Sequence, residues 1–344
     1  MALDLGFIVL IIFGPGIGNM GFHMAGNVRR KMSSSATLHI FDVNIEACRR
    51  FQSTFERHGH IDIARSSKDV AEQSAILISM VPMDQHAQSV YLDPDVGVIA
   101  ASKRPDRLIL ECSTINITTA QGIGQRIMNA DVGQYIDSPV SGGVRGAEAG
   151  TLSFFLGHIA GTDSITQNAR ETVSWMGSAD RINFCGRLGD GLVCKIVNNY
   201  IGLTNLVVAA EGLAFGLKHG VEKHTLYKCI KGSSGDSWAL NFANPVPGIV
   251  PESASSHGFK AGFTSKLCAK DIKLGIKAAQ QVGLDPKMGE VSVKYYERAD
   301  EDPRTAVSLS RHMLLTRKNI TKLTMGCARV LTALLYGYIS MTTH

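Results

Sequence analysis

Residues 7–21 read FIVLIIFGPGIGNMG, an apolar run that ends in a glycine-rich turn, and this stretch decides the fold. We interpret Phe7–Phe13 as a buried strand and Gly21–Lys31, which carries helical spacing, as the helix after the turn. In this pattern the first glycine permits a tight bend and the last lets the helix pack closely against the strand. The stretch therefore predicts one strand–turn–helix unit of a parallel sheet. Its turn comprises Gly16, Ile17, Gly18, Asn19, Met20 and Gly21.

Short apolar runs alternate with helical patterns through the first half of the chain. After the first unit, helical spacing returns at Ile45–Arg57. Such alternation is typical of a parallel sheet with helices on both faces. We therefore predict an α/β fold that begins with a Rossmann-type doubly wound sheet in residues 1–186. Its further strands are expected at Thr37–Phe41, Ala75–Val81, Leu108–Glu111, Tyr135–Ser138 and Ser153–Leu156.

The second half of the chain lacks this alternation. Asp190–Lys218 contains no proline and is apolar nearly all round, so it predicts one helix of roughly 40 Å. Helical patterns at Thr225–Lys231 and Ser265–Val282 make residues 187–305 an all-helical domain, joined to the first by this long interdomain helix. Residues 306–344 receive no assignment. Five polar side chains argue for burial of the long helix in protein and against a bilayer, namely Lys195, Asn198, Asn199, Asn205 and Glu211.

Composition argues against several classes of function. The 344 residues are 44% hydrophobic and 19% charged with a net charge of +5, which is ordinary for a soluble α/β protein. Lysine and arginine form no stripe with interleaved aromatic residues, so no nucleic-acid partner is expected. The seven cysteines contain no CxxC pair, which argues against a metal site and for a reducing compartment. Met1–Phe13 has no basic residue, so no signal peptide is expected, and it is too short for a membrane span, so no membrane partner is expected.

The glycine turn has the context of a dinucleotide site. It follows an apolar strand and precedes a helix, whose free N–H groups and positive dipole end suit a pyrophosphate. Asp42 closes the next strand, about 20 residues further on, where a carboxylate binds the ribose hydroxyls. A carboxylate at this position repels a 2′-phosphate. The sequence therefore predicts NAD, in preference to NADP, as the cofactor.

A second group of residues lies at the start of the long helix. Gly189-Asp190-Gly191 precedes Lys195, and Asn199 follows one helical turn later on the same face. Burial lowers the pKa of a lysine, and such a lysine can take the proton of an alcohol as hydride leaves. The alternative is a structural lysine whose ammonium reaches the surface. The helix alone does not decide between these two interpretations.

Two further segments follow predicted strands. Cys112-Ser113-Thr114 and the stretch 137–143, DSPVSGG, lie at strand carboxyl ends, where open α/β sheets bind ligands. Ser141 and the amides of Gly142 and Gly143 can donate hydrogen bonds to a carboxylate. Serine and glycine are also ordinary turn residues, so both interpretations remain open here.

Taken together, these segments resemble the β-hydroxyacid dehydrogenase family, and within it the eukaryotic 3-hydroxyisobutyrate dehydrogenases. The resemblance covers roughly residues 16–303. It rests on Gly16–Asn27 (GIGNMGFHMAGN), Glu111–Ile115 (ECSTI), Asp137–Leu156 (DSPVSGGVRGAEAGTLSFFL), Gly189–Asn199 (GDGLVCKIVNN), Asn244–Gly248 (NPVPG) and Gly262–Lys273 (GFTSKLCAKDIK).

The resemblance implies a role for each matching residue. Lys195 matches the catalytic lysine, Asn199 matches the amide that orients the substrate, and Ser141, Gly142 and Gly143 match the loop that holds the substrate carboxylate. The implied reaction is the NAD-dependent oxidation of 3-hydroxyisobutyrate to methylmalonate semialdehyde in valine catabolism, without a metal. The family also implies a homodimer or homotetramer in the mitochondrial matrix, although no Arg-rich presequence is visible. Further positions expected at the cofactor are Val81, Pro82, His86, Thr114, Phe263 and Lys270.

The chain departs from the family pattern in its first strand. In the family Gly-Phe-Ile runs straight into the glycine loop, whereas here Val9–Pro15 intervenes between Gly6-Phe7-Ile8 and Gly16. Either Val9–Phe13 has become the strand, or the insertion displaces the loop. His86 also stands where relatives often have an asparagine.

Two alternatives to this function remain. Within the same class, the enzyme can be a related reductase of tartronate semialdehyde, glyoxylate or succinate semialdehyde. In a different class, it can be a non-catalytic NAD-binding relative, although such relatives replace the lysine that Lys195 retains.

Overall fold

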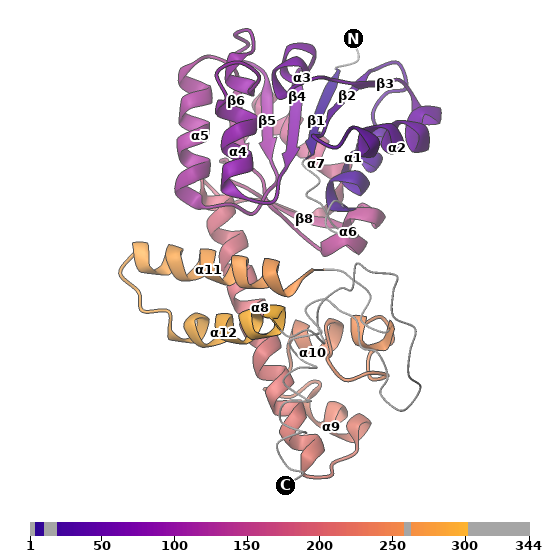
Figure 1. The fold of residues 1–344 in the computed structure, drawn as a ribbon, viewed down its shortest axis with the longest axis vertical. Helices are drawn as coiled ribbons and strands as arrows, with labels where there is room; N and C mark the ends of the chain where they lie inside the picture. Colours follow the sequence, from indigo (N-terminus) through magenta and orange to yellow (C-terminus); the bar gives the residue numbers. More distant parts are fainter. Residues whose placement is uncertain (1–3, 10–18, 258–262, 302–344) are drawn as a thin grey trace. The chain divides into compact units, whose positions relative to one another are not determined.

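The computed structural model describes residues 4–9, 19–257 and 263–301 (Figure 1). The chain divides into two compact units, residues 1–195 and 196–344. This division falls inside the long helix, whereas the sequence prediction places the domain boundary in the turn before that helix. The predicted tail, residues 306–344, lies outside the described residues.

The first unit contains a six-stranded parallel sheet in the order β3-β2-β1-β4-β5-β6. The sheet grows outward in both directions from β1 and β4, so right-handed connections place α1 and α2 on one face and α4 and α5 on the other. Its strands are β1 (Leu5–Val9), β2 (Leu38–Phe41), β3 (Ile61–Ile63), β4 (Ile76–Met80), β5 (Leu108–Glu111) and β6 (Gln134–Asp137). Its helices are α1 (Asn19–Lys31), α2 (Ile45–Phe55), α3 (Ser67–Gln73), α4 (Asp84–Leu92) and α5 (Ile117–Asn129).

A smaller sheet of three strands follows β6 in the same unit. It comprises β7 (Val140–Ser141), β8 (Leu152–Leu156) and β9 (Gly177–Phe184), with α6 (Gly143–Ala149) and α7 (Ser164–Ser174) between them. The Asn27 side chain of α1 donates to the Ala147 carbonyl of α6 over 2.6 Å, which ties the small sheet's helix to the large sheet's first helix. Both sheets share one apolar core, which includes Phe7 and Phe154.

The second unit contains helices and no strands in its described residues. Its helices are the rest of α8 (Asp190–Lys218), α9 (Lys223–Ile230), α10 (Trp238–Phe242), α11 (Ser265–Gln281) and α12 (Lys287–Glu301). The main cluster of this unit packs α8 against α11 and α12 through Leu203, Ile272 and Tyr296. The Tyr296 hydroxyl donates to the Leu203 carbonyl at 2.9 Å, so the buried phenol is satisfied by the helix it packs on.

The first strand differs from its predicted position. Leu5 pairs with Leu38 and Ile76, and β1 ends at Val9, so the strand is Gly6-Phe7-Ile8 with one residue on either side. The prediction of Phe7–Phe13 is therefore wrong at its beginning. Its part beyond Val9, with the inserted residues 10–15, lies outside the described residues.

Helix α8 is long and apolar enough, by length and composition alone, to cross a membrane, and it is the single such helix in the described part of the chain. The core helix of a soluble protein meets the same criterion. Lys195 is buried and Leu203 packs on α11 and α12, whereas Asn198, Asn205 and Glu211 are exposed, so the predicted burial of the helix inside protein holds for only part of its surface.

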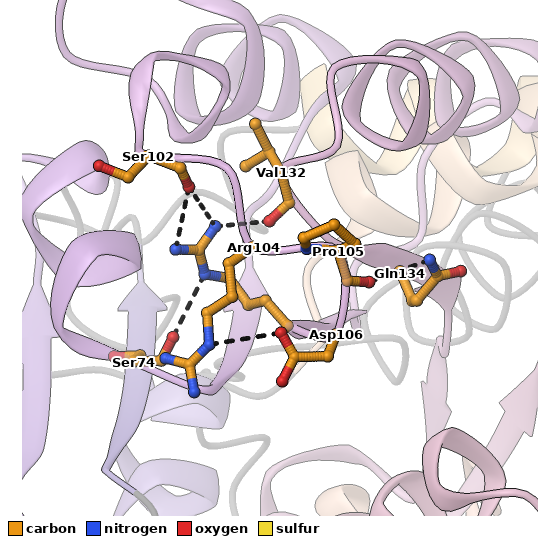
Figure 2. Close-up of polar contacts among 8 residues, drawn as sticks. Ser74, Ser102, Arg104, Pro105, Asp106, Val132 and Gln134 are labelled. Carbon is orange, nitrogen blue, oxygen red and sulfur yellow. Dashed lines mark hydrogen bonds and ion pairs between the residues drawn. The ribbon is translucent and has the colours of Figure 1, made fainter.

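A buried arginine binds backbone carbonyls at the edge of the large sheet where β4, β5 and β6 begin. Arg107 directly precedes β5 and is 1% exposed. Its guanidinium donates to the carbonyls of Ser74, Ser102 and Val132, which belong to the segments before β4, β5 and β6 (Figure 2). One cation thus satisfies backbone acceptors that burial would otherwise leave without a partner.

Replacing this arginine should destabilise the first unit. Arg107→Met keeps apolar bulk but removes every donor, so we expect the free energy of unfolding to fall by roughly 2–4 kcal/mol, since buried carbonyls lose their partners. Urea denaturation followed by circular dichroism measures this loss. Arg104→Ala, which removes an exposed ion pair with Asp106, is the control and should change stability by less than about 0.5 kcal/mol. Equal stability of the two variants would contradict the structural role of Arg107.

Candidate active site

Neighbouring parallel strands bring four of the predicted cofactor residues to one edge of the sheet. Asp42 follows β2, Val81 and Pro82 follow β4, and Thr114 lies three residues after β5. Because β2, β1, β4 and β5 are adjacent and parallel, their carboxyl ends meet at one edge, with the switch in winding direction between β1 and β4. This is where an open α/β sheet binds its ligand.

The first helix begins at the same edge. Asn19, Met20 and Gly21 form the first turn of α1, whereas Gly16, Ile17 and Gly18 lie outside the described residues. Gly21 and Asp42 line one small hollow with Phe22 and Phe51. Asp42 is 7% exposed and one of its carboxylate oxygens accepts from the Asn44 N–H at 2.8 Å. A carboxylate held this way at the end of β2 fits the ribose hydroxyls of a dinucleotide.

A buried carboxyl group fixes the segments that follow β4 and β5. Glu111 is fully buried, accepts from the Ser113 N–H at 2.8 Å and from the Ser79 hydroxyl at 2.5 Å, and Ser79 also contacts the Tyr91 hydroxyl. Burial raises the pKa of Glu111, and these hydrogen bonds oppose the shift. The Ser113 hydroxyl in turn accepts from the Val81 N–H at 2.6 Å. The turns that carry Pro82 and Thr114 are thereby joined to each other.

His86 lies in the first turn of α4 and is half-buried. Its Nδ1 is buried and has no hydrogen-bond partner within the described part of the chain. Its predicted contact with the cofactor stays a prediction. No group of three or more histidine, cysteine or acidic residues that could hold a metal ion occurs among the described residues.

The predicted substrate loop follows β6. Ser141 ends β7 and is half-buried, while Gly142 and Gly143 are exposed and open α6. Gly142 has φ of 134°, a conformation that a side chain at this position would strain. Exposed amides at the start of a helix are suitable donors to a carboxylate.

Lys195 lies in the second turn of α8 and is 6% exposed, so the side chain does not reach the surface as the structural alternative requires. The first turn of α8 is tied to the end of β6. The Asp137 carboxylate, fully buried, accepts from the Gly189 N–H at 2.7 Å and from the Leu192 N–H at 2.8 Å. The strand that leads into the Ser141 loop thus also holds the helix that carries Lys195.

Asn199 lies one turn after Lys195 on α8, in the second unit. Its amide donates to Asp271 of α11 at 2.7 Å, and the Lys270 ammonium lies 3.0 Å from the other oxygen of that carboxylate. Asp271 is 3% exposed, so this carboxylate determines which way the Asn199 amide group points. Phe263 precedes α11 and is exposed.

Three buried carboxyl groups were not predicted as site residues. Glu111 and Asp137 occur only inside quoted motifs, and Asp271 only beside Lys270. A signal for Asp271 exists in the sequence, because it falls on the apolar face of α11 with Cys268, Ile272 and Gly275. A carboxylate on an otherwise apolar helix face requires a partner. Asp137 and Glu111 end their strands, where a buried acid has no comparable pattern to reveal it.

Comparison with known proteins identifies the family. Residues 12–189 match the NAD-binding domain of 6-phosphogluconate dehydrogenase, and residues 189–308 match the NAD-binding domain of NADP-dependent 3-hydroxyisobutyrate dehydrogenase. The chain belongs to the β-hydroxyacid dehydrogenase family. Its cofactor is NAD, as the glycine turn and Asp42 predict, and the Rossmann-type domain followed by a helical domain is confirmed.

The curated relatives of this dehydrogenase carry two kinds of name. The NAD-dependent L-serine dehydrogenase of Pseudomonas aeruginosa is 34% identical over 82% of this chain and 89% of its own. The 3-hydroxyisobutyrate dehydrogenase of the same bacterium is 34% identical over 80% and 88%, respectively. The structure of Mycobacterium tuberculosis 3-hydroxyisobutyrate dehydrogenase with L-serine has a TM-score of 0.77 at 27% identity, covering 97% of this chain and 99% of its own. These names support a β-hydroxyacid dehydrogenase without deciding its acid.

Asp42 should set the preference of this dehydrogenase for NAD. In Asp42→Ala the charge that repels a 2′-phosphate is gone, so the ratio of kcat/KM with NADP to that with NAD should rise by about tenfold or more, which corresponds to about 1.4 kcal/mol. Initial rates with each cofactor measure the ratio. Asp62→Ala serves as the control. It removes a carboxylate of strand β3 that contacts His39 of β2, and the ratio should stay unchanged. An unchanged ratio in Asp42→Ala would remove the assigned role.

Proposed function

We propose that this enzyme oxidises 3-hydroxyisobutyrate to methylmalonate semialdehyde with NAD. The names of relatives from Pseudomonas aeruginosa, Dictyostelium and rat support this acid. The observation that carries the proposal is the burial of Lys195 on a helix whose first turn is fixed to the strand leading into the Ser141 loop. An amine and a set of carboxylate-binding donors are the two groups that oxidation of a hydroxy acid requires.

Different residues bind the substrate carboxylate and transfer the hydroxyl proton. The Ser141 hydroxyl and the amides of Gly142 and Gly143 hold the substrate carboxylate, which orients the carbon that bears the hydroxyl group. The Lys195 amine takes the hydroxyl proton as the carbon gives up hydride, and the Asn199 amide orients the same oxygen. Bound NAD supplies the hydride acceptor. In the reverse direction the Lys195 ammonium returns the proton to the carbonyl oxygen.

L-Serine is the second candidate substrate. It shares the carboxylate and the primary alcohol with 3-hydroxyisobutyrate and carries an ammonium where the latter has a methyl group. The P. aeruginosa L-serine dehydrogenase and the mycobacterial structure with L-serine favour this candidate. The two acids are thus distinguished by the side of the pocket that meets the second carbon. An apolar lining favours the methyl group, because an ammonium there loses its hydration without a partner.

Turnover with a panel of acids tests this proposal. We expect kcat/KM with NAD to be higher for 3-hydroxyisobutyrate than for L-serine, glycerate and 4-hydroxybutyrate. Lys195→Ala should lower kcat by roughly 10²–10⁴-fold through the loss of the general base. Its affinity for NADH, measured by fluorescence titration, should stay within a few-fold. Lys218→Ala, at the far end of the same helix, is the control. A preference for L-serine or glycerate, or full turnover by Lys195→Ala, would contradict the proposal.

We also propose that the enzyme is a homodimer or homotetramer assembled through α8. Five apolar side chains of this helix are between 41% and 64% exposed. At about 100° per residue their positions fall within roughly 80° of arc, so they form a stripe along one side of the helix, which the buried Thr204 and the exposed Glu211 interrupt. Such a stripe matches the same stripe of a second copy, as a two-fold interface requires. The α8 stripe comprises Val193, Val197, Ile201, Val208 and Phe215.

A charge in the α8 stripe should disrupt the assembly. Wild-type protein is expected to elute at a multiple of its 37.0 kDa chain mass in size-exclusion chromatography with light scattering. Ile201→Glu combined with Phe215→Glu should shift it toward the single-chain mass, since two charges would be buried without partners. Val282→Glu, at an exposed apolar residue that ends α11, should leave the mass unchanged. A monomeric wild type would contradict this proposal.

We place the reaction in valine catabolism in the mitochondrial matrix. Relatives from rat, Arabidopsis and Dictyostelium are named mitochondrial, while those of Pseudomonas and Mycobacterium are bacterial. Microscopy of the full chain with a C-terminal fluorescent tag tests the compartment, and a diffuse cytosolic signal would contradict this placement.

A further inference from the structure

We propose that Asp137 is the positioning residue of this active site, and that its carboxylate clamps the first turn of α8, and with it Lys195, to the strand from which the substrate loop departs. The inference rests on the proposed function for its catalytic consequence. The clamp itself is a property of the described residues alone, all of them in the first unit.

The residue before α8 has no side chain that could cap the helix. The position before α8 is Gly189, which has φ of 98° and no side chain to accept from the first-turn N–H groups. Asp137, more than fifty residues earlier, fills that role through two backbone donors, Gly189 and Leu192. Its negative charge also lies at the positive end of the dipole of a 29-residue helix.

The same strand end holds the substrate loop. The Asp137 carbonyl accepts from the Gly157 N–H at 2.7 Å, and the Pro139 carbonyl accepts from the Phe155 N–H at 3.1 Å. The loop from Ser138 to Ser141 is therefore bound to β8, and α8 is bound to Asp137, the residue directly before this loop. Gly191 permits the contact, because a Cβ there would lie 2.3 Å from the Phe155 carbonyl oxygen.

The clamp transmits position to the catalytic amine. Leu192 and Lys195 are separated by one helical turn, so a shift of the first turn moves the lysine by a similar amount. Reacting groups tolerate little displacement, and an error of about 1 Å costs roughly 10²-fold in rate. Loss of the clamp should therefore lower kcat while leaving the cofactor site at β1, β2 and β4 intact.

Ionisation of Asp137 controls the clamp. Burial raises the pKa of this carboxyl to about 6, the two backbone hydrogen bonds oppose the shift, and the nearby Asp190 carboxylate of α8 adds to it. The other titratable groups that face it are Tyr135 of β6 and Cys185 after β9. Above pH 6 the carboxylate accepts both N–H groups; protonation places a donor on one oxygen and weakens the clamp.

The linked effect on stability has the opposite sign. Since the pKa is higher in the folded chain than its ordinary 3.8, the folded protein binds the proton more readily than the unfolded chain. The contribution of Asp137 to the free energy of unfolding is therefore greatest below pH 3.8 and is lost as pH rises through about 6. The ionised form of Asp137, which holds the clamp, therefore contributes less to the free energy of unfolding than the protonated form.

Hydrogen exchange tests the clamp without any substrate. In Asp137→Asn the amide NH₂ faces one of the two donors, so peptides covering residues 187–195 should lose protection by about tenfold or more at pH 7.5. Asp163→Ala removes a comparable N-cap from α7, which carries no site residue, and should leave these peptides unchanged. Unchanged protection in Asp137→Asn would overturn the proposal.

Kinetics in the direction of semialdehyde reduction test the positioning role. Protonated Lys195 is the active form there, so this lysine produces no loss of rate at acid pH. Wild-type kcat should fall as pH drops through about 6, and Asp190→Asn should move that fall to lower pH by removing a charge that raises the pKa of Asp137. Asp137→Asn should lower kcat by roughly 10²-fold and abolish the fall, with NADH affinity unchanged.

The outcomes separate the two proposals. A wild type that binds NADH yet reduces no semialdehyde contradicts the proposed function, while hydrogen exchange still decides whether Asp137 clamps α8. An active wild type whose acid limb persists in Asp137→Asn, at undiminished kcat, overturns the positioning role. Thermal unfolding of each variant at pH 7.5 confirms that the compared proteins are folded.

Discussion

Two hydrogen bonds from a helix end to one buried carboxylate connect the parts of this enzyme that must act together. Gly189 and Leu192 donate to Asp137, and through them the long helix α8 is attached to the last strand of the large sheet. The sheet brings the cofactor residues to one edge by its parallel topology alone. The substrate loop and the lysine have no such common origin, because β6 and α8 are far apart in the sequence. A specific polar contact is required to bring them into register.

The same device recurs at each part of the site. Glu111 joins the turns after β4 and β5, Asp137 holds the start of α8, and Asp271 orients Asn199 within the second unit. All three carboxyl groups are buried, and none is itself a predicted ligand of substrate or cofactor. Burying a carboxyl group costs stability unless hydrogen bonds compensate for lost hydration. The three acids that carry this cost each lie beside a predicted site residue. Functional sites commonly give up some stability for a fixed orientation of their groups.

Elements with a repeating pattern were predictable from the sequence, and contacts between distant residues were not. The period of apolar residues indicates the strands around Ile40 and Ile78, and α8 was predicted with both of its ends. β3, β7 and β9 were missed because Ile61–Ile63 and Val140–Ser141 are short and Gly177–Phe184 is largely exposed, so none of them forms an apolar run. The first strand was misplaced because the apolar run continues beyond Val9, and periodicity does not show where in such a run the pairing with β2 and β4 begins.

Lys195 and Asn199 were predicted as site residues from their spacing and from the resemblance to a family, whereas the buried acids Asp137 and Asp271 were found only in the fold. Spacing along one helix is a local property and remains visible in the sequence. The pairing of Asn199 with Asp271 joins two helices, and the contact of Asp137 with Leu192 joins a strand to a helix. Such pairs leave no periodic signal, and a single sequence does not show which acids share a partner.

Helix α8 is apolar on more than one side because more than one side of it meets apolar surroundings. A surface helix has one apolar face, but here Leu203 and Val207 face the core of the second unit while the α8 stripe lies exposed. If a second copy covers that stripe, two sides of the middle of the helix are buried in the assembly, and apolar residues on both of these sides are what burial predicts. This explains why the helix satisfies the length and hydropathy of a membrane span. Of its polar residues, Asn198, Asn205 and Glu211 are exposed to solvent, whereas the buried Lys195 lies where we propose that chemistry, and not packing, selects the residue.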